Sequence, residues 1–398
     1  IASIGEVPED FRAAKVIDGK DKFAVPGFVN AHTHASMTLF RSYADDMNLM
    51  DWLNNMIWPA EAKMQEEDIY WGAMLAAVEM IEGGTTTFAD MYGPYMEKVA
   101  EATADAGLRA VLSRGIIGVA PDGDAKIEEN VALYKDFHGA ADGRITVMFG
   151  PHAPYTCPPD FLKKVAKTAQ SLGAEVHIHM AETKAEIEQI TKAYGKRPFR
   201  YVEETGLFDG KGTLAAHCVH LDEEDIAIIK KHGIRVAHNP GSNMKLASGV
   251  APVPRLLKEG VCVALGTDGA SSNNNLDMLE EINLAAMLHK VSTLDPLAVP
   301  ARTALKMGTE YGAKAVGLTG VGKLEAGCKA DITLFDMDGA AWYPRNDLAS
   351  LLVYSAHADS ASTVLVDGKV LMEDKELLTL DKERIFYEAQ KCAERLTK

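Results

Sequence analysis

Short apolar segments alternate with helix-length amphipathic segments over most of the chain, from Gly27 to about Gly322. Apolar runs of this length, separated by segments long enough for crossover helices, predict an α/β fold with parallel strands. Eight such runs can be counted: Gly27–Thr33, Thr85–Asp90, Arg109–Arg114, Ile145–Gly150, Ala174–Met180, Thr213–Cys218, Gly233–His238 and Val261–Thr267. Eight parallel strands with intervening helices is the number that closes a barrel, whose active site lies at the carboxyl ends of the strands.

Helical patterns fill the gaps between the expected strands, and several are followed by the glycine that commonly ends a helix. The clearest patterns are Glu66–Glu82, Pro158–Leu172, Lys184–Glu204, Glu223–Lys231 and Leu276–Lys290. Between the first strand and Glu66 the chain shows no clear barrel periodicity. We therefore expect an unusually long connection after the first strand.

The pattern changes after Gly322. Strand-like segments with glycine-containing turns cover Lys323–Phe335 and Ser362–Met372, and an amphipathic helix is expected over Asp381–Thr397. The opening residues Ala13–Val25 look like a hairpin. This hairpin could pair with the C-terminal strands, because chain termini often lie close together.

These patterns divide the chain into two expected units. Residues 26–322 form a barrel domain, and residues 1–25 and 323–398 together form a smaller, mostly β domain. The chain opens at Ile1 rather than at a methionine, in what looks like the end of a strand, so we expect further residues before it.

Charge and composition exclude several classes of protein. The 398 residues include 57 acidic and 41 basic side chains, and the formal net charge of -16 repels phosphate backbones. No uncharged apolar run is long enough to span a bilayer, and the start lacks a charged-then-apolar secretory segment. We expect a cytoplasmic protein that binds neither nucleic acid nor a membrane.

The cysteines give no sign of a structural framework. They are scattered and include no Cys-x-x-Cys pair, so neither a disulfide network nor a thiolate zinc site is indicated. We expect five buried free thiols: Cys157, Cys218, Cys262, Cys328 and Cys392.

The segment His32-Thr33-His34 ends the first expected strand. Successive side chains on a strand point to opposite faces, so two histidines separated by one residue project to the same side and can share a metal ion. A His-x-His pair alone is weak evidence, because such pairs also arise by chance. Whether His32 and His34 bind a metal ion therefore depends on the residues at the ends of the other strands.

Further ligands and acid–base groups follow three later strands. Strand five ends in His177-Ile-His-Met-Ala-Glu182, strand six in Ala215-Ala-His217 and strand eight in Leu265-Gly-Thr-Asp268. Three imidazoles and one carboxylate, with a position left for water, suit zinc or a similar divalent ion. We assign His179, nearer the catalytic mouth, as the strand-five ligand and expect His177 to pack in the barrel interior.

Each of these side chains also has a purely structural interpretation. Asp268 could cap the following helix, Glu182 could be a charge favoured by a helix N-terminus, and His217 could be a satisfied core histidine. Their joint occurrence at one face of the expected barrel favours a catalytic site. Three histidines in helical or connecting segments are expected to be packed or solvated: His138, His232 and His289.

Five segments are distinctive in combination: Pro26-Gly-Phe-Val-Asn-Ala-His-Thr-His34, His179-Met-Ala-Glu-Thr183, Ala215-Ala-His-Cys218, His238-Asn-Pro-Gly-Ser-Asn-Met-Lys-Leu-Ala-Ser-Gly249 and Gly266-Thr-Asp-Gly-Ala-Ser-Ser-Asn273. Together they resemble the amidohydrolase superfamily, and more narrowly its 5'-methylthioadenosine/S-adenosylhomocysteine deaminases, over nearly the whole chain. The resemblance implies a distorted eight-stranded β/α barrel with a small β-sandwich built from both termini. It also implies a homo-oligomer, and one divalent metal ion held by His32, His34, His179 and Asp268.

The reaction implied by this resemblance is hydrolytic deamination of an adenosine-type nucleoside to the inosine-type product and ammonia. A metal ion lowers the pKa of bound water from about 15.7 toward 7. Asp268 would contact the metal and accept the water's proton, His217 would orient or polarise the water, and Glu182 would deliver a proton to a ring nitrogen. Zinc is the expected ion, although the same ligands also bind Fe²⁺, Mn²⁺ or Ni²⁺.

By the same resemblance, Glu61 would hold the ribose hydroxyls, while Arg114 and His152 would contact the sugar or its 5' substituent. Trp52 would line the thioether side, although tryptophans at such positions often fill a core instead. Where relatives carry a second arginine for an amino-acid carboxylate, this chain has Lys126. A lysine supplies charge without a planar two-pronged donor.

Three other functions stay open from the sequence. Deaminases or hydrolases of a free base or triazine share the metal set, although Glu61, Arg114 and His152 favour a ribosylated purine. A two-metal amide hydrolase needs a bridging ligand on strand four, commonly a carboxylated lysine, and residues 145–152 contain no lysine. A non-catalytic protein with a closed structural metal site has no need of Glu182 and His217 beside an open position.

Overall fold

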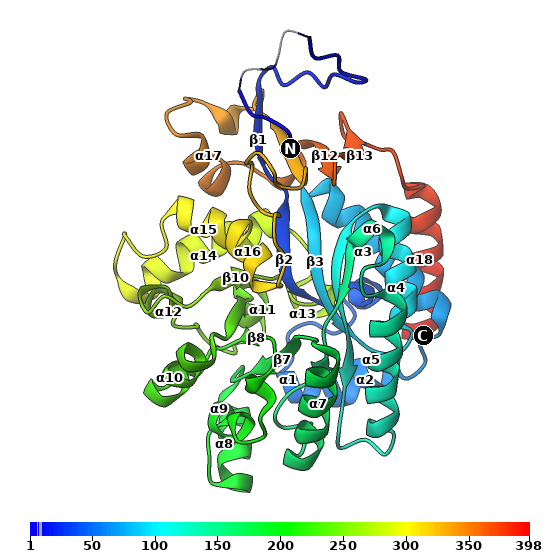
Figure 1. Ribbon diagram of the computed structural model, residues 1–398, viewed down its shortest axis with the longest axis vertical. Coiled ribbons are helices and arrows are strands. Elements are labelled where there is room, and N and C mark those ends of the chain that lie inside the picture. The colour runs from blue at the N-terminus through cyan, green and yellow to red at the C-terminus, as the bar shows by residue number, and fades with distance from the viewer. Residues whose placement is uncertain (6, 8–9) are drawn as a thin grey trace.

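Parallel strands form the centre of the molecule, in two hydrogen-bonded runs (Figure 1). The computed structural model describes residues 1–5, 7 and 10–398. The first run contains β2 (Phe28–Thr33), β3 (Thr85–Tyr92), β4 (Arg109–Ile116) and β5 (Ile145–Val147), with β6 (Gly150–Pro151) paired to β4. The second contains β7 (Val176–Met180), β8 (Thr213–His217), β9 (Arg235–His238) and β10 (Val263–Leu265). These runs contain the eight strands expected from the sequence.

The two runs meet at both of their edges, which makes a distorted eight-stranded barrel. On one side, a single parallel bridge joins Phe149 to Val176. On the other side, the side-chain amide of Asn30 donates to Thr267 Oγ1 at 2.7 Å, and the amide of Asp268 donates to the carbonyl of His32 at 2.9 Å. The second junction therefore ties the first strand directly to the loop that follows the last one.

Small apolar side chains fill the interior of the barrel. Every residue of β3, β7 and β8 is buried, as expected for strands covered on both faces. One buried cluster joins residues of six strands and Met148, which follows β5: Val29, Ala31, Ala89, Val111, Met148, Leu214, Ala237 and Ala264 belong to it. Packing of this kind makes the barrel a solid core, so ligands are confined to its ends.

Helices surround the strands. The longer ones are α3 (Glu66–Glu82), α4 (Met96–Ala106), α5 (Gly123–Phe137), α7 (Pro159–Leu172), α8 (Lys184–Tyr194), α10 (Glu223–His232), α14 (Met278–Thr293) and α18 (Lys382–Thr397). Shorter ones are α1 (Leu49–Trp52), α2 (Trp58–Glu61), α6 (Ala140–Gly143), α9 (Pro198–Glu203), α11 (Pro240–Lys245), α12 (Val253–Lys258), α13 (Ala270–Asn273), α15 (Ala301–Met307), α16 (Glu310–Ala315) and α17 (Leu348–Tyr354). Among the described residues, no helix combines the length and the apolar character needed to cross a membrane.

One helix expected from the sequence is broken in the structure. The pattern over Lys184–Glu204 is two helices, α8 and α9, and the single-helix prediction is wrong. Gly195 ends α8 in the left-handed region with φ 69°, and Pro198 begins α9. Glycine tolerates positive φ, and proline is favoured in the first turn of a helix, so both residues mark a boundary.

The two ends of the chain share an antiparallel sheet, which we call the terminal sheet (Figure 1). Its order is β1 (Lys22–Pro26), β11 (Ile332–Asp336), β12 (Ala361–Val366), β13 (Lys369–Glu373) and β14 (Glu376–Leu377). Pairing between the opening residues and the C-terminal strands is confirmed. The expected hairpin over Ala13–Val25 is wrong, because only its last four residues, from Lys22 on, form a strand. Residues 1–5 are likewise irregular, although Ile1 and Gly327 share a backbone hydrogen bond.

Two features join the terminal sheet to the barrel. Gly27 alone separates β1 from β2, and an ideal Cβ there would lie 2.2 Å from Thr86 Cγ2, so only glycine fits without rearrangement. Arg109, which opens β4, forms a buried two-pronged ion pair with Asp331, at 2.8 and 3.1 Å. Helix α18 packs along α3 of the barrel.

Candidate metal centre and active site

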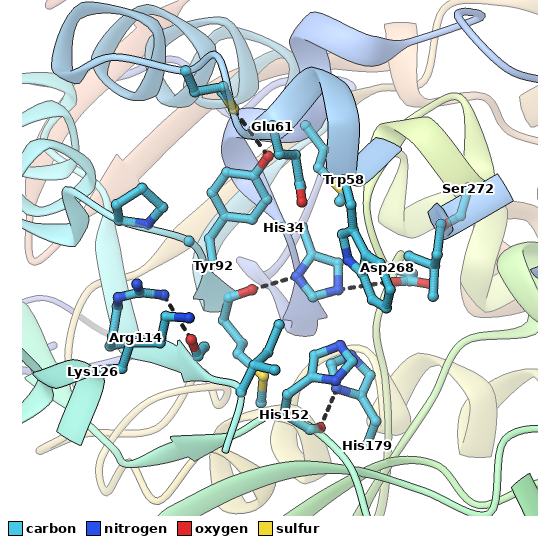
Figure 2. Close-up of a pocket in the computed structure, with 18 of the residues that line it drawn as sticks. His34, Trp58, Glu61, Tyr92, Arg114, Lys126, His152, His179, Asp268 and Ser272 are labelled. Atoms are coloured by element: carbon cyan, nitrogen blue, oxygen red, sulfur yellow. Dashed lines mark hydrogen bonds and ion pairs between the residues drawn. The ribbon is translucent and has the colours of Figure 1, made fainter. Parts of the chain in front are cut away.

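A cavity of about 570 Å³ opens at the carboxyl ends of the barrel strands (Figure 2). Its inner end contains four side chains from strand ends: His34, His179, His217 and Asp268. Its walls contain the remaining residues singled out in the sequence, namely Trp52, Glu61, Arg114, Lys126, His152 and Glu182. His32 lies beneath the surface of the cavity and is fully buried. The structure thus brings every predicted site residue to one place.

Two overlapping groups of donor atoms at the inner end could hold a metal ion. His32, His34 and His179 form one group, and His32, His217 and Asp268 form the other, with donor atoms in each group within 4.8 Å of one another. Asp268 Oδ1 lies 3.1 Å from His34 Nε2 and 3.4 Å from His32 Nε2. Residues more than 200 positions apart therefore converge through the barrel closure.

The ring orientation of each predicted histidine ligand is fixed from behind. His34 Nδ1 donates to the carbonyl of Met91, and His179 Nδ1 donates to the carbonyl of His152 at 2.7 Å. His32 Nδ1 lies 2.8 Å from His177 Nε2. With the Nδ1 atoms engaged, the Nε2 atoms are the ones available to a metal ion.

The donor set fits a divalent cation. His32 Nε2 is buried and has no hydrogen-bond partner among the described residues. An unsatisfied buried nitrogen is costly, and coordination of a cation would satisfy it. Three imidazole nitrogens and one carboxylate oxygen are ligands that zinc and similar ions accept while keeping a place for water.

Asp268 follows β10 in a left-handed conformation, with φ 63°. The hydroxyls of Ser242 and Ser272 donate to its Oδ2 atom at 2.7 and 3.0 Å, which leaves Oδ1 facing His32 and His34. Burial opposes ionisation, but the neighbouring imidazoles of His32 and His34 hold the pKa of Asp268 well below its ordinary value. The carboxylate is therefore ionised and directed at the donor cluster.

Glu182 and His217 stand beside this cluster. Glu182 Oε2 lies 3.8 Å from His217 Nε2. His217 Nδ1 lies 2.9 Å from Asn243 Oδ1, which fixes the ring with Nε2 toward the cavity. Burial raises the pKa of Glu182 above its ordinary value. A raised pKa makes the carboxyl group hold its proton more tightly, which suits a group that donates a proton to a substrate.

Helical segments between the first strand and α3 cover one wall of the cavity. They supply Trp52, Trp58 and Glu61 through α1, α2 and a π-helical turn over Leu53–Ile57. Burial raises the pKa of Glu61 to about 7, although a hydrogen bond with Tyr92 acts in the opposite direction and lowers the pKa. The long connection expected from the sequence is therefore made of short helical segments that line the cavity.

Two cations line the cavity on another wall, and each is paired with an acid. Arg114 Nε lies 2.6 Å from Glu129 Oε2, and Lys126 Nζ lies 2.8 Å from Asp122 Oδ1. Glu129 and Asp122 also line the cavity. In Figure 2, Arg114 and Lys126 lie together, well away from Asp268. This wall presents charges of both signs.

Sequence reasoning missed several contacts of the site. His177 is not only a packed core residue, since its ring bonds to His32. The supports from Ser242, Ser272 and Asn243 were also unforeseen, although the first and last lie in the segment His238–Gly249 and Ser272 lies in Gly266–Asn273. The three histidines expected outside the site do not line the cavity. They form hydrogen bonds with other residues: His138 with Val147, His232 with Glu203 and His289 with His238.

Comparison with known proteins gives a consistent result. The sequence model of the amidohydrolase family matches residues 23–371. A 5-methylthioadenosine/S-adenosylhomocysteine deaminase from Pelotomaculum thermopropionicum is 57% identical over 98% of this chain and 90% of its own length. Relatives with this name therefore match nearly the full chain.

Solved structures share the fold. An adenosine deaminase from Xanthomonas campestris with bound zinc superposes with a TM-score of 0.90 at 35% identity, covering 94% of this chain and 86% of its own. An atrazine chlorohydrolase from Arthrobacter aurescens complexed with zinc gives a TM-score of 0.91 at 26% identity, covering 98% and 93%. The two neighbours carry zinc but act on different substrates.

Proposed function

The chain belongs to the amidohydrolase family, and from this premise we propose that it hydrolytically deaminates adenosine-type nucleosides. The substrates are 5'-methylthioadenosine, S-adenosylhomocysteine and adenosine, and the products are the inosine-type nucleoside and ammonia. The observation that carries the proposal is the placement of Glu182 and His217 beside a divalent-ion donor set. The name of the 57% identical relative supports the choice of substrate.

One divalent ion, as zinc in the two solved neighbours, would be held by His32, His34, His179 and Asp268. When bound, such an ion lowers the pKa of water, so that hydroxide is available near neutral pH. His217 Nε2 faces the same position and orients the water, because its Nδ1 atom is held by Asn243. These residues assemble the nucleophile.

Proton transfers fall to two carboxyl groups. Asp268 accepts one proton from water as the oxygen attacks the carbon that bears the amino group, and Glu182 gives its proton to the neighbouring ring nitrogen. Ring protonation makes that carbon a better electrophile. Asp268 then passes its proton to the amine, the carbon–nitrogen bond breaks, and ammonia leaves. Glu182 recovers a proton from the new hydroxyl group as the carbonyl forms.

The remaining cavity residues bind the nucleoside outside the reacting ring. Glu61 accepts hydrogen bonds from the ribose hydroxyls, and Trp52 lines the thioether side. Arg114 and His152 contact the sugar or its 5' substituent. Lys126 contacts the carboxylate of a homocysteine tail, which requires that it exchange Asp122 for the ligand. A wall with both charge signs suits a substituent that is itself zwitterionic.

A hydrolase of a free base or triazine is the second candidate, because the atrazine chlorohydrolase shares the fold. Such substrates are small and lack a sugar. The charged wall formed by Arg114, Lys126 and their partners would then have no role in binding. This wall is the observation that favours a nucleoside.

Direct assay separates the two candidates. Zinc-loaded protein is mixed in turn with adenosine, 5'-methylthioadenosine, S-adenosylhomocysteine, guanine and atrazine, and ammonia or chloride release is measured together with adenine absorbance. We expect ammonia and loss of adenine absorbance with the nucleosides. A Glu182→Gln preparation tests for a contaminating deaminase, since it must lose the activity. Turnover of guanine or atrazine alone would contradict the assignment.

We also propose a cytoplasmic location and a homo-oligomeric state. All five cysteines are free thiols in the structure, which suits a reducing compartment.

The support for an oligomer is a surface of exposed apolar side chains. Large apolar side chains are exposed along one face of α14 and just after it, at Met287, Val291 and Leu294, as at a surface covered by another subunit. Cell fractionation and light scattering of the purified protein test these two points, and a monomer would contradict the second.

A further inference from the structure

Glu186 lies directly behind Glu182, on the first turn of α8. Its Oε1 atom accepts a hydrogen bond from the amide of Ala181, and its Oε2 atom accepts one from the amide of Glu182, both at 2.9 Å. The side chain is buried, with 3% of the residue exposed. Glu186 is not among the residues that line the cavity, so it makes no direct contact with a substrate bound there.

The turn held by Glu186 is a strained one. Ala181 has φ 51°, in the left-handed region, which costs a residue with a Cβ atom about 1 kcal/mol. The turn must redirect the chain from β7 into α8 within a few residues and still direct Glu182 into the cavity. On its other side, the carbonyl of Ala181 accepts from the amides of Val219 and His220, at 3.0 and 2.9 Å. The turn is therefore fixed from two sides.

The chemistry of this contact calls for a carboxylate. Two backbone N–H groups point at the two oxygens of Glu186, and each oxygen accepts one hydrogen bond. Glutamine has the same shape, but it would place an NH₂ group against one of the two amides, so one acceptor would be lost and two donors would face each other. The helix cap does not need this arrangement, because Thr183 Oγ1 already accepts from the amide of Glu186 at 3.2 Å.

We propose that Glu186 is a positioning residue for Glu182, and that its carboxylate fixes the backbone turn that directs the Glu182 carboxyl group at the substrate. The inference rests on the proposed function, in which Glu182 transfers a proton to a ring nitrogen. A displacement of about 1 Å at a reacting group can slow catalysis roughly 100-fold. Glu186 acts only through Glu182 and touches no reacting atom.

The first test compares kinetic constants. Glu186→Gln is expected to lower kcat for 5'-methylthioadenosine by about tenfold or more. KM and zinc content should change less than about twofold, because no ligand or substrate contact is removed. Thr183→Ala is the matched control, since it weakens the start of the same helix and leaves both Glu186 contacts in place. Its kcat should equal that of wild type.

A double-mutant cycle separates positioning from a general structural effect. In a Glu182→Gln background, Glu186→Gln should have no further effect on the residual kcat, because the group it positions is already gone. An equal loss in both backgrounds overturns the proposal, and so does an unchanged kcat or a loss confined to KM. Where Glu186→Gln does not fold, Glu186→Asp replaces it. Its shorter side chain cannot reach both amides, and an unchanged kcat overturns the proposal in the same way.

A crystal structure of Glu186→Gln gives a test that does not depend on the substrate. We expect a displaced turn at Ala181 and a Glu182 carboxyl group turned from its wild-type position, and an unmoved Glu182 overturns the proposal. Failure of the proposed function looks different, because the wild-type protein would then leave all three adenosines unchanged. The crystallographic result would still decide the role of Glu186.

Discussion

The Nδ1 atom of His32 lies 2.8 Å from the Nε2 atom of His177, below the floor of the cavity. Because Nε2 of His32 is directed at the donor cluster, the proton of the neutral ring is on Nδ1. This N–H group donates a hydrogen bond to His177 Nε2. Hydrogen bonds of this type orient metal-binding histidines and make them better ligands. His177 thus acts on the metal centre without contacting the ion.

Replacement of His177 by phenylalanine is expected to weaken zinc binding by about 10- to 100-fold, because His32 Nδ1 loses its acceptor. Competition with a chelator of known affinity measures this effect. Glutamine at position 177 offers a side-chain oxygen as an acceptor and should restore part of the affinity. The exposed His357 provides a control, and His357→Ala should bind zinc as the wild type does. Equal zinc affinity of wild type and His177→Phe would remove the role assigned to this hydrogen bond.

Replacement of Glu182 by glutamine is expected to lower kcat by about 100- to 10,000-fold, because the amide cannot donate an acidic proton to the ring. Zinc content should not change, since Glu182 is not among the ligands. Steady-state kinetics together with metal analysis tests both statements. Glu188→Gln changes an exposed glutamate on α8, the helix that follows Glu182, and should have normal activity. A Glu182→Gln enzyme with wild-type kcat would refute its role as the acid.

Replacement of Lys126 by alanine should raise KM for S-adenosylhomocysteine by roughly tenfold, as expected for one lost charged contact, and have little effect on KM for 5'-methylthioadenosine. Only the first substrate has a carboxylate for the ammonium group to bind. Lys135→Ala is the matched control, because Lys135 is an exposed lysine on the same helix, α5. The same change in KM for both substrates would show that Lys126 does not contact the homocysteine tail.

Removal of the buried carboxylate in Asp331→Ala should lower the free energy of unfolding by about 3 to 5 kcal/mol, because Arg109 would keep a buried and unpaired charge. The exposed pair between Lys164 and Asp124 gives the comparison, and Lys164→Ala should cost less than about 1 kcal/mol. Urea unfolding measures both. A small effect of Asp331→Ala would mean that water reaches Arg109 when its partner is lost.

The metal centre was largely predictable from the sequence, because parallel strands of a barrel bring their carboxyl ends together. Once His34 and Asp268 were placed at the ends of the first and last strands, their contact followed, and the structure places them 3.1 Å apart. His34 was identified as half of a His-x-His pair, and Asp268 by its place after the last strand together with the resemblance to the amidohydrolases. The position at a strand end carried the information.

Contacts made by loops and by ring orientation could not be predicted in this way. The bond between His177 and His32 depends on how the barrel strands are staggered, which residue spacing does not specify. The serines that hold Asp268 come from short helices without a periodic apolar pattern. The break between α8 and α9 could have been predicted, because Gly195 and Pro198 are residues that end and begin helices. It was overlooked because the segments on both sides of it have helical periodicity.

Gly27 connects the terminal sheet directly to the strand that contains His32. It is the only residue between β1, which is anchored to β11, and β2, which contains His32, a proposed metal ligand. Four residues separate it from His32, a span of roughly 16 Å in extended chain. The backbone from the terminal sheet to His32 is thus one nearly continuous extended segment, without a loop between the two sheets. We therefore expect substitutions in the terminal sheet that displace β1 to alter the position of His32 as well.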